Sequence, residues 1–440
     1  LPPFFGLISA LLLARLARRL SPMPADAVDR ALPFLSGALW VTYSTVVLFD
    51  TLLTACVLLA LGGVVEAWRG RPRRGWLAYA AGVGLGLLAK GPVVLVHVLP
   101  VALLAPWWAT DSPPAGWRRW YLGSMAAVVL GAGLGLAWAL AAAAREGPAY
   151  RTAILWEQTA GRMGHAFAHQ RPWWWYVPLL PVILFPWTLW PPLWRSLARV
   201  VRAPVEVSTR FALAWVVPGW IILSLISGKQ VHYLMPLLPG FAILAAVAYP
   251  RIDPTAHRWD TAATAGCLIL AGLLLLFSPG IHRILTLPGW ATAISFQWGL
   301  VFLLGGLLLG LAKGGREQVV ALSLVSPALL ILAHLAGRGV AARAYDLRPV
   351  AHFLEAAETA GRPIAYVGRY SGQFHFLGRL ERPFDQITPP QVARWTADHP
   401  SGLVVRDQRS PAAAAGAILS RPYRDGVIGI WEASGTRIDR

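Results

Sequence analysis

The sequence predicts an all-α polytopic membrane protein that ends in a small soluble α/β domain. Three observations support this fold class. Of the 440 residues, 56% are apolar and 14% are charged, whereas soluble domains have about 45–50% and about 25%. Runs at 46–65, 125–144 and 261–277 are nearly free of charge and approach the roughly 20 apolar residues that cross a bilayer. After residue 337, charged residues become frequent again.

About twelve membrane segments can be placed before residue 338. The second, fourth and fifth are short or interrupted, which favours tilted or partly re-entrant segments. A transmembrane domain over residues 1–337 is therefore expected. The segments lie near 3–15, 31–43, 45–65, 75–89, 92–109, 121–144, 173–194, 211–227, 231–249, 260–278, 290–312 and 318–336.

Residues 338–440 mix two kinds of local pattern. Strand-like stretches cover 363–368, 402–406 and 426–433, and helix-like stretches cover 350–359 and 390–398. Strands that alternate with helices are typical of a small α/β domain.

The net charge of +18, from 39 basic and 21 acidic residues, would suggest nucleic acid as the partner of a soluble protein. Here the basic residues lie mainly in short segments between apolar runs, so membrane topology explains them and no nucleic acid is expected. The loops after the odd-numbered segments carry most of the arginines, which places these loops in the cytoplasm. The C-terminal domain is then expected on the outer side.

Several common site types lack their sequence signatures. The only cysteines, Cys56 and Cys267, lie inside apolar segments and make neither a disulfide framework nor a zinc cluster. No Rossmann or Walker glycine pattern occurs, and the glycines of 82–91 and 131–135 indicate close helix packing. The first residue is Leu and no signal peptide is visible, so we expect the natural protein to begin upstream.

Two ionisable residues stand near the outer ends of predicted segments, where such groups are a hypothesis of function. Asp50 opens the third segment; it is either a carboxylate that favours the helix N-terminus or a catalytic or orienting group. Lys90 is followed by Gly91 and Pro92, which break the helix. It is either a lysine that reaches the interface or an anion-binding group held by a tight turn.

Two outer loops add further candidates. The turn 227–236 brings Lys229, His232 and Tyr233 together; it is a polar hairpin loop or part of a site, and its single good ligand does not suit a metal. In the loop 145–172, the spacing around Arg162 predicts an interfacial amphipathic helix, with or without chemistry. His165 and His169 of this loop would need a third ligand to hold a metal.

One carboxylate, several cations and a phenol on one side of the membrane would form a cationic pocket. Such a pocket suits an anionic lipid headgroup, especially a phosphate.

Four motifs in order carry a family resemblance: 48–53, 84–92, 172–176 with 185–187, and 227–236. Together they resemble the bacterial dolichyl-phosphate-mannose-protein mannosyltransferase-like family, which includes the aminoarabinose transferases that modify lipid A. The resemblance covers about residues 1–340 and extends to the tail only in kind. It implies a GT-C glycosyltransferase fold in the bacterial inner membrane, with the active site and C-terminal domain facing the periplasm.

The resemblance also implies an inverting sugar transfer from a polyprenyl-phosphate carrier to a lipid A-like or protein acceptor. Asp50 is implied as catalytic, although the family's principal acid lies in a first outer loop that we expect upstream of residue 1. No cofactor is required, and a divalent cation stays open because Glu157 and Gln158 occupy the stretch comparable to a family histidine. The residues implied for substrate binding are Lys90, Arg162, Lys229, His232 and Tyr233.

Two other functions fit the composition. A secondary transporter would explain broken helices and charges at membrane depth, but the sequence has no detectable inverted repeat and its charges lie at the outer face. A non-catalytic membrane assembly protein would use the soluble tail to bind its partner. Measuring sugar transfer from a polyprenyl carrier would distinguish a glycosyltransferase from both of these alternatives.

Overall fold

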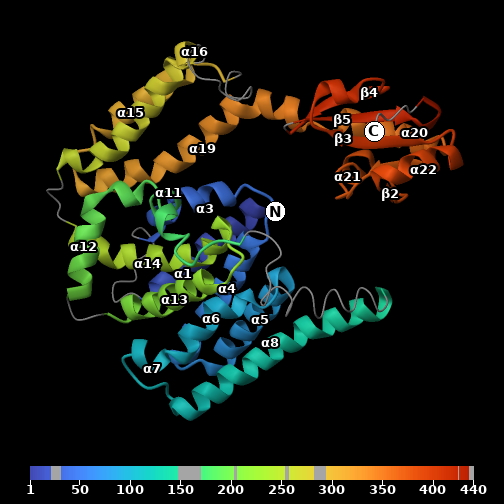
Figure 1. Cartoon of the computed structure of the whole chain (residues 1–440). Helices are drawn as coiled ribbons and strands as arrows, with labels where there is room; N and C mark the ends of the chain where they lie inside the picture. The colour runs from blue at the N-terminus through green and yellow to red at the C-terminus, as the bar shows by residue number, and fades with distance from the viewer. Residues whose placement is uncertain are drawn as a thin grey trace. The chain divides into compact units, whose positions relative to one another are not determined.

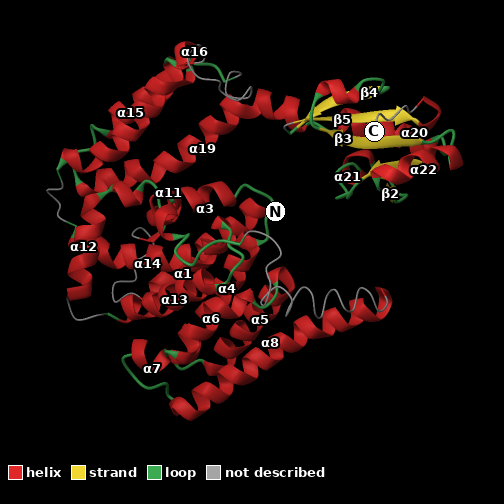
Figure 2. Ribbon diagram, viewed as in Figure 1, coloured by secondary structure: helices red, strands yellow, loops and turns green. Residues whose placement is uncertain are grey.

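The computed structural model of the chain describes residues 1–20, 31–146, 170–202, 206–252, 257–281, 294–424 and 426–435. Two compact units divide it: residues 1–276 with 299–332, and residues 277–298 with 333–440. The first is helical and the second contains a five-stranded sheet (Figures 1 and 2). The predicted fold class, an all-α membrane part with a small α/β domain, is confirmed. The division falls inside α19 (Gly315–Tyr345).

The described part of the first unit is built from helices. Its described elements are α1 (Pro2–Leu20), η1 (Pro33–Ser36), α3 (Ala38–Tyr43), α4 (Asp50–Trp68), α5 (Pro72–Lys90), α6 (Val93–Leu103), α7 (Ala105–Trp108), α8 (Gly116–Glu146), η3 (Val177–Leu179), α11 (Leu180–Ile183), η4 (Trp187–Leu189), α12 (Pro191–Arg202), α13 (Val207–Leu225), η5 (Val231–Leu237), α14 (Leu238–Ala248), η6 (Tyr249–Arg251), η7 (Arg258–Thr261), α15 (Ala262–Leu276), α18 (Trp298–Leu309) and the first part of α19.

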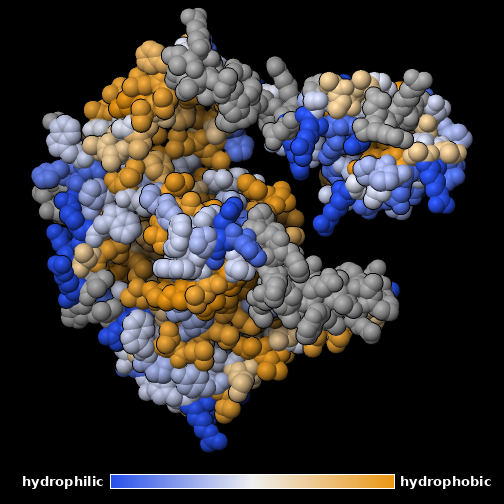
Figure 3. Space-filling model, viewed as in Figure 1, coloured by the Kyte–Doolittle hydropathy of each residue, from blue (hydrophilic) through white to orange (hydrophobic). Residues whose placement is uncertain are grey.

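Six stretches of the described residues are long and apolar enough to cross a membrane. Hydrophobic side chains on them are exposed, for example Met125 (63%) and Leu324 (61%), and Figure 3 shows such surface in orange over α15. Lipid is the solvent that such surfaces require, so the chain is a multi-pass membrane protein. The six stretches are Asp50–Trp68, Gly116–Arg145, Val207–Leu225, Val231–Arg251, Trp259–Leu276 and Gly315–Gly339.

Some predicted segments differ from the structure. The segment 173–194 is not one helix but the short turns η3, α11 and η4, followed by α12. Of the three segments expected to be short or interrupted, 31–43 divides into η1 and α3 and 92–109 into α6 and α7, whereas 75–89 is the continuous helix α5. The helix of the third segment, 45–65, runs from Asp50, the residue expected to open it, to Trp68. In 173–194 the reason is proline, which lacks the N–H that continues a helix, at Pro178, Pro181, Pro186, Pro191 and Pro192.

Helices α4 and α5 form an antiparallel hairpin that sets the geometry of the site. They approach so closely that a Cβ built on Gly82 of α5 would lie 2.6 Å from the carbonyl oxygen of Cys56 in α4. Close packing is the expected role of the glycines at 82–91 and 131–135. Gly82 and, where α5 meets α8, Gly84 and Gly131 confirm it, whereas a Cβ on Gly91 or Gly133 would meet nothing within 4 Å. Since α4 and α5 have equal lengths, the first residue of α4 meets the last residue of α5.

Adding a methyl group at Gly131 is expected to loosen the contact between α8 and α5. A Cβ there would lie 2.7 Å from the carbonyl oxygen of Ala80, and such overpacking costs about 1–3 kcal/mol. Gly133→Ala on the same helix meets nothing within 4 Å and serves as the control. Thermal unfolding in detergent should show a lower midpoint for Gly131→Ala alone; equal midpoints would contradict the tight contact.

The second unit contains a mixed sheet with helices on both faces. Strand β1 (Ile364–Val367) pairs in parallel with β2 (Asp385–Ile387) and β3 (Leu403–Gln408), whereas β5 (Gly426–Glu432) pairs antiparallel with β3 and β4 (Leu419–Tyr423), in the order β2-β1-β3-β5-β4. Helix α20 (Arg348–Thr359) packs on one face and α22 (Val392–Asp398) on the other. The three predicted strands and two predicted helices are confirmed, and β2 and β4 were missed. The remaining elements are α16 (Ser278–Ile281), α21 (His375–Gly378), η8 (Pro389–Gln391), η9 (Pro411–Ala414) and η10 (Ala433–Gly435).

Candidate active site

A partly buried ion pair joins the end of α5 to the start of α4. The Nζ of Lys90 lies 2.5 Å from Oδ1 of Asp50 and donates a hydrogen bond to it. Asp50 is the first residue of α4 and is 1% exposed, while the Lys90 side chain is 25% exposed. Gly91, with φ +72°, ends α5 directly after the lysine. Glycine tolerates that conformation at no steric cost, so the turn holds Lys90 at the helix end.

The turn η5 brings an aromatic pair to this ion pair. Lys90 Nζ lies 4.6 Å from the centroid of the Tyr233 ring, within the range of a cation–π contact. The Nε2 atom of His232 lies 3.8 Å from Oδ2 of Asp50, and the His232 and Tyr233 rings meet edge to face at 5.0 Å. Asp50, Lys90, His232 and Tyr233 therefore form one cluster that comes from three elements.

Tyr43 is a further neighbour that the sequence reasoning missed. Its ring lies 5.5 Å from the His232 ring, and it is the last residue of α3. A phenol at the end of a short apolar segment resembles an ordinary interfacial tyrosine. No signal in the sequence separated it from the other tyrosines of the chain.

The cluster has the charges of an anion-binding site in which the cation, Lys90, is already paired with a carboxylate, Asp50. An ammonium group has three N–H donors, so Lys90 can bind Asp50 and still donate to a second anion. Its partial exposure leaves a route for that anion. Asp50 is buried, and removing one partner of a buried pair typically costs about 3–5 kcal/mol because the other charge is left uncompensated.

Lys229 has a different environment from the one expected for a phosphate-binding lysine. It is 2% exposed, and its ammonium donates to the carbonyl oxygen of Arg171 at 3.0 Å and to that of Ile226. Both acceptors are backbone groups. The structure thus brings Lys90, His232 and Tyr233 to Asp50, and directs the described hydrogen bonds of Lys229 elsewhere.

The remaining expectations concern the loop 145–172. Arg162, the amphipathic helix around it, His165 and His169 lie outside the described residues, as do Glu157 and Gln158. Within the part of the chain that the structure describes, no group of three or more His, Cys, Asp or Glu residues could hold a metal ion.

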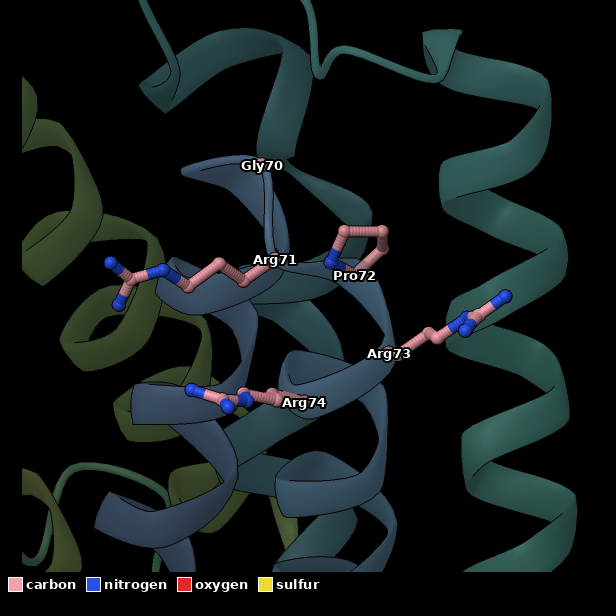
Figure 4. A pocket seen from close by; sticks show the side chains of 5 residues that line it. All are labelled: Gly70, Arg71, Pro72, Arg73 and Arg74. Carbon is pink, nitrogen blue, oxygen red and sulfur yellow. The ribbon is translucent and has the colours of Figure 1, made fainter.

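An arginine-rich cavity lies at the opposite end of the α4–α5 hairpin. It measures about 400 Å³ and is lined by Gly70, Arg71, Pro72, Arg73 and Arg74. Figure 4 shows the side chains of Arg71 and Arg74 pointing to one side and that of Arg73 to the other. They do not converge on one ligand. This turn matches the arginine excess that the sequence analysis assigned to the cytoplasmic loops.

Comparison with known proteins identifies similar chains, although no family model matches. A curated relative from Pseudomonas aeruginosa (strain LESB58), the undecaprenyl phosphate-alpha-4-amino-4-deoxy-L-arabinose arabinosyl transferase, is 35% identical over 316 residues, 66% of this chain and 55% of the relative. The enzyme of that name from Enterobacter sp. (strain 638) is 28% identical over 293 residues, 64% of this chain and 51% of the relative. The chain spans about half the length of the curated relatives it matches.

Two solved structures have a fold similar to that of this chain. The crystal structure of ArnT from Cupriavidus metallidurans bound to undecaprenyl phosphate has a TM-score of 0.72 at 20% identity, over 97% of this chain and 82% of that one. The apo structure of the same protein has a TM-score of 0.73 at 19% identity, over 98% of this chain and 83% of that one. The chain is therefore a homologue of the bacterial aminoarabinose transferases and has their GT-C fold.

Proposed function

We propose that this protein transfers a sugar from a polyprenyl-phosphate carrier to a lipid acceptor at the extracytoplasmic face of the bacterial inner membrane. The observation that carries the proposal is the Asp50–Lys90 pair at the helix ends, with Tyr233 over the ammonium. The names of the curated relatives support it, because those enzymes use an undecaprenyl-phosphate sugar.

The chemistry requires cations where negative charge develops. The acceptor oxygen bonds to the anomeric carbon, the bond between that carbon and the phosphate oxygen breaks, and the electron pair leaves on the phosphate. Preorganised donors that face this charge lower the barrier. In the proposal, Lys90 and the Tyr233 hydroxyl bind the phosphate, together with Arg162 from the loop 145–172. His232, whose ring contacts that of Tyr233, is the further polar side chain at the proposed phosphate site.

Asp50 is the proposed catalytic carboxylate of the described residues. One of its oxygens accepts from Lys90 and the other faces His232. A carboxylate in this position orients the lysine, whose ammonium it accepts a hydrogen bond from. It can also accept the proton that the acceptor hydroxyl loses, which is general-base catalysis. Attack from the face opposite the phosphate would invert the anomeric configuration.

The decisive experiment uses membranes from cells that express the natural gene. A radiolabelled undecaprenyl-phosphate aminoarabinose donor is added with lipid A, and lipid and protein fractions are counted separately. The expected result is label in the lipid fraction, in an amount that EDTA does not change. NMR of the product should show that the anomeric configuration is inverted relative to the donor. Label in the protein fraction would show that the acceptor is a protein and not a lipid. Loss of transfer in the presence of EDTA would establish a metal requirement. No transfer with any polyprenyl-phosphate sugar would refute the proposal.

The orientation in the membrane is a separate prediction. The loops after the odd-numbered segments hold the arginine excess, which predicts that the C-terminal domain lies in the periplasm. A phosphatase reporter that works only in the periplasm should therefore be active when it is fused after Arg440. A fusion after Arg74, at the α4–α5 turn, is the matched control and should be inactive. Activity of the Arg74 fusion, or inactivity of the Arg440 fusion, would place the Asp50–Lys90 pair on the cytoplasmic side.

A further inference from the structure

Two segments that are distant in sequence are tied together beside the active site. The first segment, 170–176, begins with the last residues of the loop 145–172, and the second, 226–230, leads from α13 into η5. Gln170 and Gly228 form an antiparallel bridge. The N–H of Arg171 donates to the carbonyl oxygen of Ser227 at 3.1 Å. We call the pair of segments the outer latch.

Lys229 adds a charged contact to this latch. Its ammonium donates both to the carbonyl oxygen of Arg171, in the first segment, and to that of Ile226, in the second. The Tyr176 hydroxyl donates to the carbonyl oxygen of Gln230 at 3.2 Å. The lysine is thus a buried cross-link whose charge is stabilised by backbone dipoles, and hydrogen bonds from charged groups are the stronger kind.

The latch decides where η5 begins. Val231, the first residue of η5, follows Gln230 directly, and His232 and Tyr233 are the next two residues. A chain that is fixed at 226–230 therefore fixes the two rings that lie against Asp50 and Lys90.

We propose that Lys229 is a positioning residue of the latch and does not bind the phosphate. It holds the segment 226–230 against 170–176, and through it places Tyr233 over the Lys90 ammonium. For Lys229 to bind a phosphate, it would have to give up its hydrogen bonds to two backbone carbonyl groups. The part of the inference that concerns sugar transfer rests on the proposed function, whereas the clamping of the latch does not.

The first test measures how closely the two segments of the latch are held together, and it needs no activity assay. Antiparallel partners have Cα atoms about 4.5–5.5 Å apart, which lies within the range of a disulfide. Gln170→Cys/Gly228→Cys, in a Cys267→Ser background, should therefore oxidise rapidly in the full chain. Adding Lys229→Met should slow disulfide formation about tenfold, because the segments then separate more often. Adding Lys313→Met, a lysine outside the latch, should leave the rate unchanged. Equal rates with and without Lys229→Met would overturn the proposal.

The second test uses sugar transfer. Lys229→Met should lower the rate of transfer about tenfold or more, as expected when a positioning contact is lost. Oxidation of Gln170→Cys/Gly228→Cys in the Lys229→Met protein should restore most of the rate, and dithiothreitol should remove it again. A cross-linked protein that stays as slow as Lys229→Met would mean that the ammonium acts on the donor itself, which overturns the proposal. Absence of transfer in the wild type would count against the proposed function and leave the disulfide result to decide on the latch.

Discussion

Lys90→Met should lower sugar transfer by about 10²–10³-fold, the loss seen when one donor to a developing oxyanion is removed. Methionine keeps the length and flexibility of lysine but cannot donate. Lys90→Arg should recover the rate only in part, because the guanidinium is a planar fork of different shape. Initial rates at saturating donor, measured in membranes with matched protein content, check this.

The same substitution should also destabilise the protein, and a double variant separates the two effects. Lys90→Met leaves Asp50 buried without its cation; since Lys90 is a quarter exposed, we expect a cost at or below the lower end of the range for buried pairs, about 2–3 kcal/mol. Asp50→Asn/Lys90→Met removes both charges and should regain most of the thermal stability in detergent without regaining transfer. If the double variant is active, the ion pair is structural and the phosphate binds elsewhere.

Asp50→Asn should lower the rate of transfer by about 10²–10⁴-fold if the carboxylate accepts the proton of the acceptor. The amide has the same shape and can still accept a hydrogen bond from Lys90, so the loss reports the charge and the basicity. A carboxylate that only orients Lys90 would give a smaller loss, about tenfold. The rate measured over a range of acceptor concentrations distinguishes a loss of turnover from a loss of binding.

Glu66→Gln is the control for Asp50→Asn on the same helix. Glu66 lies near the opposite end of α4 and pairs with Arg19 and Arg71, far along the helix from the proposed site. It should leave the rate of transfer within about twofold, because partly exposed ion pairs contribute little. An equal loss in the two variants would indicate that α4 responds to any lost carboxylate, and that Asp50 has no special role.

The sequence by itself determined the features that depend on local chemistry. Asp50 begins a helix and Lys90 ends one, because the dipole favours a carboxylate at the start and Gly91 adopts a positive φ at the end. Composition identified the membrane class and the soluble tail. Alternating apolar patterns located β1, β3 and β5, whose apolar residues are buried in the sheet.

Only the tertiary structure decided what these local features meet. Asp50 and Lys90 are forty residues apart, and they pair because glycine packing of α4 on α5 aligns their ends. The acceptors of Lys229 are carbonyl groups, one of them fifty-eight residues away, and a backbone oxygen leaves no mark in the residue pattern. Tyr43 reaches His232 only through the fold. The physical reason is common to all three: a side-chain contact between distant segments depends on how helices pack, and local propensity does not encode it.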